Sequence, residues 1–214
     1  MIISSTGLTN STHCPLEQDF QKAVTCLAQG KIVAFPTETF YGLAVDPFNE
    51  KALTALFSLK RRALHKPFPI LIQNEAQLAD LASEIPGAYK LLMKSFWPGP
   101  LTLVFPAVEG LSSMLTGKSG GIGIRISPHP VACKFGRFWK RPMTATSANL
   151  SGCAAARTAE DVLHFFGDEV ACILDGGQTP GGMSSTVVGF MDGKLQLLRE
   201  GAIDFSALNQ AIGQ

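Results

Sequence analysis

The sequence lacks the features that mark several large classes of protein. Its 214 residues carry 18 Lys and Arg against 17 Asp and Glu, so no charge excess draws nucleic acid or an acidic membrane to a broad surface. No stretch approaches the ~18 uninterrupted apolar residues of a membrane span. Residues 1–14 show no basic region followed by an apolar run, as a secretory signal would. We therefore expect a cytoplasmic protein with no membrane partner.

Cysteine and histidine are sparse and scattered. The five cysteines form none of the close pairs that a zinc site or a redox motif requires, and the four histidines are dispersed as well. His129 lies between two prolines, which is more typical of a structural residue than of a ligand. A Walker loop, a GxGxxG turn, an HExxH helix and a GxSxG elbow are also missing. We expect a reducing environment, no metal held by the protein, and none of the commonest nucleotide or hydrolase sites.

The length of the chain and the absence of a linker or repeat predict a single α/β domain spanning residues 1–214. The 46% hydrophobic content, 21 glycines and 13 prolines are typical of a buried core crossed by tight turns. Helices are expected at residues 15–29, about 49–60, 75–82, 87–96, after Pro130, and at 158–166. Strands are expected at residues 31–36, 68–72, 101–105, 121–126, 142–146, 171–174, 185–190 and 194–199. Because Asp192-Gly193 favours a type I′ hairpin between the last two strands, the sheet should be mixed.

Polar segments follow or interrupt several of these strands. The strand at 31–36 ends at a proline and leads residues 37–42 into a loop, where Thr37, Glu38 and Thr39 could be mere loop punctuation. Pro69 favours a sheet edge for the strand at 68–72. Arg125 should face away from the Ile side of its strand, toward something polar.

Ser147, Asn149 and Ser151 follow the strand at 142–146. Their side chains could hold phosphate oxygens or a ribose, and they could equally form a helix cap or an Asx turn. The same two interpretations apply to Ser184, Ser185 and Thr186.

Cations are concentrated in one short segment. Four of them lie within residues 60–66, directly before an apolar stretch, and Arg125 lies inside an apolar strand. Arg presents a planar fork and Lys a mobile charge, so the mixture suits a ligand with both carboxylate and phosphate groups. Taken singly, each of three cations is best explained as part of a solvated helix end, where its charge complements the helix dipole: Lys60, Arg61 and Lys66. Arg62 and Arg125 together favour a binding role.

Several segments, in this order and at this spacing, resemble the YrdC/TsaC family. They are PTETFYGL at 36–43, KRR at 60–62, WPGPLT at 97–102, GIR at 123–125 with PHP at 128–130, SANLSG at 147–152, STVV at 185–188 and REGAI at 199–203. The resemblance covers about residues 18–203. It implies an α/β fold with a twisted open sheet, flanking helices and a concave, positively lined cavity.

The resemblance also implies an activity. Family members of this type join ATP, bicarbonate and L-threonine into threonylcarbamoyl-AMP and release pyrophosphate, for threonylcarbamoyladenosine modification of tRNA. Mg²⁺ would accompany ATP without a fixed protein site. A separate complex would transfer the product, so no stable tRNA binding is expected, and the chain should lack the extra C-terminal domain of longer relatives.

Matching positions imply residue roles. Lys60 and Arg62 would be the catalytic cations. ATP would contact Arg62, Lys66, Gly121, Ser147, Asn149 and Arg199, although the family usually has a smaller polar group in place of Lys66. Threonine would contact Thr39, Arg125, Ala145 by its main chain, and Ser185.

Other functions compete with this one. A cationic cavity could serve an RNA-binding module in ribosome maturation, although the balanced charge argues against it. A carbamoyl-handling enzyme would resemble one domain of hydrogenase maturation factors, whose acylphosphatase and zinc-finger modules are absent. Departures at Phe40, Ala63, Pro69 and Gly189 leave open a YciO-type paralogue of uncertain role, and the intact Ser-Ala-Asn favours the synthase.

Overall fold

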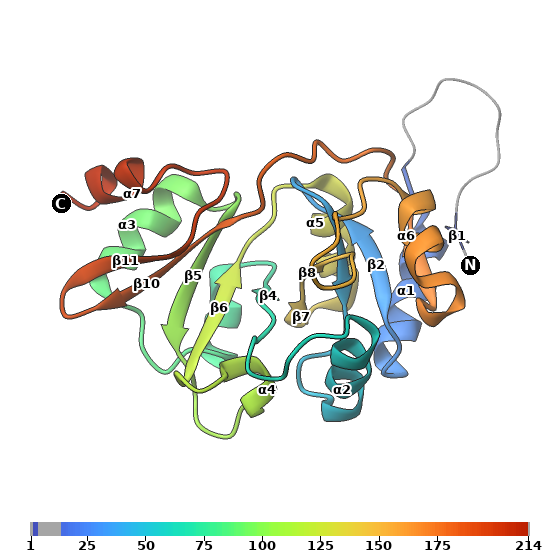
Figure 1. The fold of residues 1–214 in the computed structure, drawn as a ribbon, viewed down its shortest axis with the longest axis horizontal. Helices are drawn as coiled ribbons and strands as arrows, with labels where there is room; N and C mark the ends of the chain where they lie inside the picture. The colour runs from blue at the N-terminus through green and yellow to red at the C-terminus, as the bar shows by residue number, and fades with distance from the viewer. Residues whose placement is uncertain (1, 4–13, 214) are drawn as a thin grey trace.

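The strands form two mixed β-sheets in a computed structural model that describes residues 2–3 and 14–213 (Figure 1). Across the first sheet the order is β1 (Ile2–Ile3), β9 (Cys172–Leu174), β2 (Val33–Pro36), β3 (Tyr41–Ala44) and β8 (Thr146–Ser147). Across the second it is β11 (Lys194–Arg199), β10 (Thr186–Met191), β5 (Leu101–Pro106), β6 (Gly121–Arg125), β4 (Ile70–Leu71) and β7 (Met143–Thr144). Each sheet combines parallel and antiparallel pairs, which confirms the mixed α/β fold.

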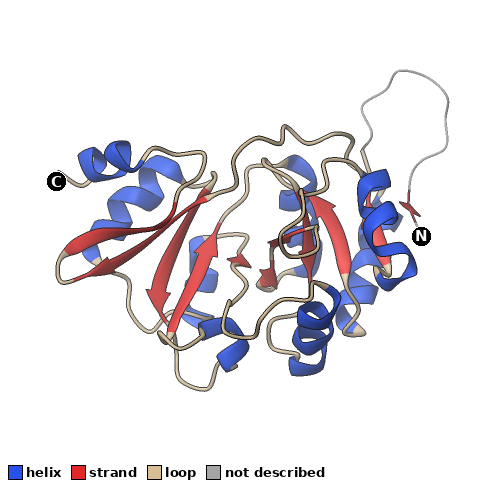
Figure 2. Ribbon diagram, in the orientation of Figure 1, coloured by secondary structure: helices blue, strands red, loops and turns tan. Residues whose placement is uncertain are grey.

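Helices lie on the outside of both sheets (Figure 2). Helix α1 packs against α5 and β9 beside the first sheet, and α3 packs against α7 beside the second. The expected helix at 75–82 is instead a 3₁₀ helix. The elements are α1 (Glu17–Ala28), α2 (Glu50–Leu59), η1 (Glu75–Asp80), α3 (Gly87–Phe96), α4 (Ser113–Thr116), α5 (Pro130–Trp139), α6 (Ala159–Phe166), η2 (Gly167–Glu169) and α7 (Phe205–Ala211).

Local sequence signals account for several element ends. Helix α1 stops before Gly30, whose φ of +73° suits a residue without a β-carbon. Helix α6 begins after Thr158, whose hydroxyl accepts the Asp161 N–H at 3.1 Å in the expected capping box. Positive φ angles at Asp192 and Gly193 confirm the tight hairpin between β10 and β11.

Three expectations about strands are wrong. Residues 37–42 are only partly a loop, because Tyr41 already begins β3 and pairs with Pro36. Pro69 does not mark a sheet edge: β4 lies between β6 and β7, and Pro69 precedes the first paired residue, so its missing N–H is not needed. The strand expected at 142–146 is divided at Ala145 into β7 and β8, which belong to different sheets.

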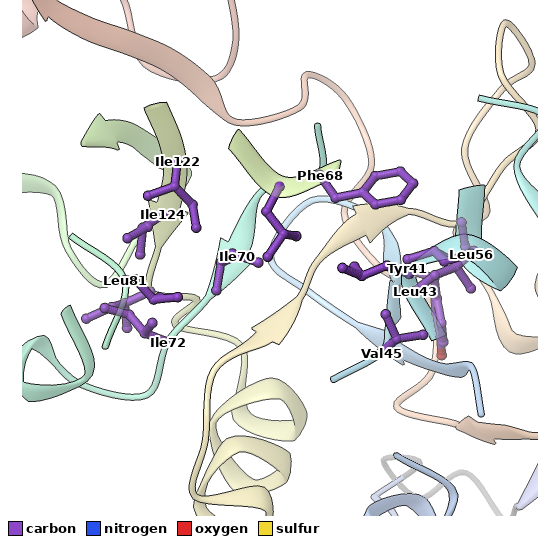
Figure 3. Packing of buried hydrophobic residues seen from close by; sticks show 14 of the residues in the cluster. Tyr41, Leu43, Val45, Leu56, Phe68, Ile70, Ile72, Leu81, Ile122 and Ile124 are labelled. Atoms are coloured by element: carbon purple, nitrogen blue, oxygen red, sulfur yellow. The ribbon is translucent and has the colours of Figure 1, made fainter. Parts of the chain in front are cut away.

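The two sheets share a core at this division. One cluster of buried apolar residues contains Leu43 of the first sheet and Ile70, Ile122 and Ile124 of the second (Figure 3). The Ala145 N–H donates to Pro69 O at 2.9 Å, and Thr144 N–H donates to Val45 O at 3.1 Å. The seam between the sheets is therefore packed and hydrogen-bonded, which fixes the relative positions of loops from both sides.

The expectations of no secretory signal and no membrane span can be compared only with the residues that the structure describes. Most of the segment 1–14, for which no secretory signal is expected, lies outside the described residues, namely residues 1 and 4–13. Within the remainder, none of the helices is long and apolar enough to cross a membrane.

Candidate functional site

A cavity of about 540 Å³, its open mouth included, lies where loops of the two sheets meet. The first sheet and its loops contribute mainly hydroxyls, while Arg125, Arg199 and Arg62 bring positive charge from the second sheet and the segment before β4. The lining consists of Thr37, Thr39, Phe40, Tyr41, Gly42, Arg62, Pro69, Arg125, Ala145, Thr146, Ser147, Ser184, Ser185 and Arg199.

Arg125 reaches this cavity because of strand alternation in β6. Ile122 and Ile124 are buried on one face of the strand, and Gly121, Gly123 and Arg125 lie on the other. The Arg125 Nη1 donates to Glu38 Oε1, and the side chains of this ion pair are only 7% and 13% exposed. The expectation that Arg125 faces a polar group is confirmed, and the polar group is Glu38.

Arg199 is joined to Ser185 and Thr102. Its Nη2 donates to the Ser185 carbonyl at 2.7 Å and to the Ser185 hydroxyl oxygen at 2.9 Å, and its Nε donates to the same carbonyl at 3.2 Å. The Ser185 and Thr102 hydroxyl oxygens are 2.9 Å apart. Burial, followed by the charges of Arg125 and Arg62, lowers the pKa of Arg199. The three arginines therefore share one electrostatic environment, in which an anionic ligand would relieve their repulsion.

Arg62 is held by the segment that follows it. Its Nε donates to Lys66 O at 2.7 Å, its Nη2 donates to Pro67 O at 3.3 Å, and its guanidinium carbon lies 5.3 Å from the centre of the Phe68 ring. Burial lowers the pKa of Arg62. These contacts hold Arg62 where it lines the cavity, and they give Lys66 a role through its backbone, since its side chain is exposed.

Lys60 is not part of the cavity wall. It is the C-cap of α2 and only 2% exposed, and its Nζ donates to Ser147 O, to Asn149 O at 2.7 Å and to Asn149 Oδ1 at 3.1 Å. The interpretation of Lys60 as a solvated helix end is therefore wrong. Burial, and secondarily the charge of Arg62, lowers the pKa of Lys60 to about 7.

The loop that Lys60 holds is also braced internally. The Ser147 hydroxyl donates to Asn149 Oδ1 at 2.7 Å, and Asn149 Nδ2 donates to Cys153 O at 2.7 Å. Ser147 lines the cavity, while Asn149 lies behind it among the loop's own groups. The lysine and the asparagine together set the position at which Ser147 meets the cavity.

A second cavity of about 860 Å³, its open mouth included, adjoins the first and shares Arg62, Pro69 and Arg199 with it. Part of its floor is backbone, because Gly121 and Gly123 present no side chains there. A β-carbon at Gly121 would lie 2.7 Å from a Val104 methyl carbon, so the strands pack too closely for one without adjustment. Apolar residues surround this floor: Pro67, Phe68, Pro69, Val104, Val187 and Leu198.

The structure brings most of the expected site residues together. All four expected threonine contacts (Thr39, Arg125, Ala145 and Ser185) line the first cavity. Of the expected ATP contacts, Arg62, Ser147 and Arg199 line the first cavity, and Gly121 lines the second with Arg62 and Arg199. Lys60, Lys66 and Asn149 line neither, and the roles assigned to them from the resemblance stay predictions.

Sequence reasoning missed Glu38 and Thr102. The sequence alone allows Glu38 to be no more than a loop residue, although an acidic residue next to a buried strand can signal a buried partner. Thr102 is a polar residue within an otherwise apolar strand, and that contrast was the available signal. His129 accepts the Val131 N–H at 3.2 Å through Nδ1, so it caps α5. Among the described residues, no group of three or more His, Cys, Asp or Glu is placed to hold a metal ion.

Comparison with known proteins gives consistent matches. The family model for Sua5, YciO and YrdC proteins, described as "Telomere recombination", matches residues 25–201. A threonylcarbamoyl-AMP synthase of Pyrococcus abyssi is 39% identical over 88% of this chain and 55% of its own length. One from Bacillus subtilis is 38% identical over 90% of this chain and 56% of its own length. One from Vibrio cholerae is 34% identical over 87% of this chain and 99% of its own length.

Solved structures agree with this result. The crystal structure of P. abyssi Sua5 complexed with L-threonine superposes with a TM-score of 0.90 at 36% identity, covering 100% of this chain and 61% of that one. E. coli YciO superposes with a TM-score of 0.79 at 22% identity, covering 89% and 92%, which shows a shared fold. The chain thus spans a little over half the length of the P. abyssi and B. subtilis relatives. It spans nearly the whole length of the V. cholerae relative.

Proposed function

The chain belongs to the Sua5/YciO/YrdC family, and we propose that it is a threonylcarbamoyl-AMP synthase that uses ATP, bicarbonate and L-threonine. The observation that carries this proposal is the cavity in which Arg62, Arg125 and Arg199 lie together with several hydroxyls. Three guanidinium groups in one partly enclosed site suit two opposed anions, a carboxylate and a polyphosphate. A structural relative was crystallised with L-threonine, which supports the amino acid as one of them.

The amino-acid end is proposed at Arg125. The Arg125 guanidinium would bind the threonine carboxylate. The Thr39 and Ser185 hydroxyls, which can both donate and accept, would form hydrogen bonds with the polar groups of the amino acid. Ala145, at the seam between the sheets, would contribute main-chain contact. All four residues border one cavity, so a single small molecule could touch each of them.

The nucleotide end is proposed across Arg62, Arg199 and the second cavity. The glycine floor at Gly121 and its apolar border suit a flat purine ring, and the two arginines at the junction of the cavities would face the phosphates. Ser147 would contact the phosphates or ribose from the opposite loop. In this arrangement the α-phosphate comes close to the amino-acid end, where the reaction requires it.

The chemistry then needs chiefly positioning and charge neutralisation. Bicarbonate takes up a proton and gives CO2 and water, and the deprotonated threonine amine then adds to the CO2 carbon, forming a C–N bond and returning a proton. A carbamate oxygen bonds to the α-phosphorus while the bond from that phosphorus to the β-bridging oxygen breaks. Pyrophosphate leaves with the electron pair. Arg62 and Arg199 would neutralise the charge that this step brings together.

The remaining substrates and partners follow from the same proposal. Mg²⁺ enters as part of the MgATP substrate. Transfer of the threonylcarbamoyl group to tRNA is assigned to a separate complex, without stable tRNA binding here. We place the reaction in the cytoplasm, and the five free cysteines are typical of a reducing compartment.

The test is a pyrophosphate-release assay with purified protein, MgATP, bicarbonate and single amino acids, together with mass analysis of the adenylate. We expect release that requires both bicarbonate and threonine. Release with all amino acids alike, or with none, would contradict the proposal. Carbamoyl phosphate in place of bicarbonate and threonine tests the carbamoyl-handling alternative, and RNA binding in a salt titration tests the ribosomal one.

A further inference from the structure

Glu38 is a largely buried carboxylate beside the cavity, 13% exposed, that none of the roles above uses. It lies in the turn between β2 and β3, between two threonines that line the cavity. One of its oxygens accepts from Arg125 Nη1, and the other accepts from the Ser127 hydroxyl. The carboxylate thus joins the turn of the first sheet to the end of β6 in the second.

The pairing divides the Arg125 guanidinium into two parts. Nη1 is held by Glu38. Among the described residues, every fully buried side-chain nitrogen or oxygen has a hydrogen-bond partner, so the nitrogens of Arg125 that Glu38 does not hold are not fully buried, and Arg125 lines the cavity. A planar guanidinium held at Nη1 presents its other donors, Nε and Nη2, in a defined direction, and this is what bidentate binding of a carboxylate requires.

Glu38 could instead compete with a substrate carboxylate and leave when one arrives. The surrounding contacts argue against this. The Ser127 hydroxyl that holds Glu38 also accepts the His129 N–H at 3.2 Å, so this anchor does not depend on Arg125. The turn itself is closed by the Thr37 hydroxyl donating to Phe40 O at 2.7 Å and by Gly181 N–H donating to Thr39 O at 2.8 Å.

Charge balance points the same way. Burial lowers the pKa of Arg199, and the charges of Arg125 and Arg62 lower it further, while Glu38 offsets the charge of Arg125 from inside the protein. A departing Glu38 would leave a carboxylate that is only 13% exposed without its cation, which is costly. Retaining Glu38 lets Arg125 bridge two carboxylates, one fixed and one exchangeable.

We propose that Glu38 is a positioning residue that orients Arg125 toward the carboxylate of the amino-acid substrate. This inference rests on the proposed function, because the substrate is taken to be threonine. Glu38 acts through Arg125 and contacts neither the reacting carbon nor the phosphorus. Its effect should therefore fall on amino-acid affinity and on recognition of the carboxylate, leaving the chemical step largely intact.

The test compares Glu38→Gln with the unchanged protein in the pyrophosphate-release assay. We expect the KM for threonine to rise about tenfold or more, while kcat and the KM for ATP change by less than about twofold. Ser127→Ala removes one anchor of the same carboxylate and should raise the threonine KM by a smaller factor. Glu169→Gln, at an exposed glutamate, is the matched control and should change nothing.

A substrate analogue separates orientation from general damage. Threoninamide lacks the carboxylate, so the unchanged protein should prefer threonine strongly, and Glu38→Gln should lose most of that preference. A merely structural change would weaken both ligands alike. A lower threonine KM in Glu38→Gln would show competition and overturn the inference, as would an unchanged KM or an intact preference.

The unchanged protein also distinguishes the two levels of failure. If it shows no threonine-dependent release, the proposed function is wrong. If it does, and Glu38→Gln behaves like Glu169→Gln, only the role of Glu38 is wrong. Thermal unfolding of each variant verifies folding, and Ser127→Ala keeps the inference testable if Glu38→Gln does not fold.

Discussion

Three consecutive cations should respond very differently to replacement by alanine, because the structure places them in three environments. Lys60 is buried against the loop at 147–149, Arg62 lines the cavity, and Arg61 is exposed. The comparison tests the assignment of roles within one segment. It also separates loss of a ligand contact from loss of the scaffold that positions one.

Lys60→Ala should cost the most stability. Its ammonium serves Ser147 O, Asn149 O and Asn149 Oδ1, and each buried acceptor that loses its donor costs ~1–3 kcal/mol. With partial relaxation and entry of water, we expect about 3–5 kcal/mol, comparable to breaking a buried charge pair. That is a large share of the ~5–15 kcal/mol by which a domain is stable. Adenylate formation should be lost together with stability.

Arg62→Ala should separate the two effects. The side chain is half-buried and loses two hydrogen bonds and one ring contact, which together stabilise the fold by about 1–2 kcal/mol. Activity should fall on the order of 10²-fold or more, as when a transition-state donor is removed. Arg61→Ala should change the free energy of unfolding by less than about 0.5 kcal/mol and leave activity nearly unchanged.

Urea denaturation followed by circular dichroism measures the stability of each variant, and pyrophosphate release measures activity. Stability should decline in the order Arg61→Ala, Arg62→Ala, Lys60→Ala. Full stability with complete loss of activity in Lys60→Ala would refute the scaffold role and favour direct contact of Lys60 with the phosphates. Equal losses in all three variants would refute the whole assignment.

Three further outcomes follow. Arg61 has a φ of +49°, so Arg61→Gly should raise the free energy of unfolding by about 0.5 kcal/mol in urea denaturation; a decrease would contradict this. Gly121→Ala brings a methyl group against Val104 in the second cavity, so the KM for ATP should rise severalfold while threonine binding measured by calorimetry stays constant. Lys60 gives up its proton near pH 7 when folded and near pH 10 when unfolded, so the unfolded state binds more protons between these values and stability should rise with pH there. Lys60→Met cannot titrate at this position. Relative to it, the free energy of unfolding of the unchanged protein should rise by about 2–3 kcal/mol between pH 7 and pH 9. A difference that does not change with pH would show that the three acceptor oxygens keep Lys60 charged.

Features that depend on neighbouring residues were predictable from the sequence. The capping box at Thr158 and the hairpin at Asp192-Gly193 form as expected, because each is closed within a few residues. The alternation that turns Arg125 away from Ile122 and Ile124 also needs only the strand itself. Family resemblance added the set of cavity residues, which come from segments far apart in the sequence.

Features that depend on distant partners were not predictable. The ion pair between Glu38 and Arg125 spans 87 positions, and nothing in the turn around Glu38 indicates its partner. Lys60 follows a helix whose end would ordinarily be solvated. It is buried because its ammonium donates to backbone oxygens of the loop at 147–149, which is far away in the sequence. Pro69 suggested an edge because the sequence does not show that its strand begins one residue later.

The division of the strand at Ala145 explains why the site lies where it does. β7 pairs with β4 of the second sheet and β8 pairs with β3 of the first, so one residue carries the chain from one sheet to the other. Residues on either side of this seam present hydroxyls and cations to the same cavity. Because the seam is fixed by a shared core and by backbone hydrogen bonds, the cations need not be brought together by the ligand itself. For the proposed reaction, such preorganisation would let binding energy act on the reacting groups. The Glu38–Arg125 pair adds to it, because it joins the first sheet to the second beside the cavity.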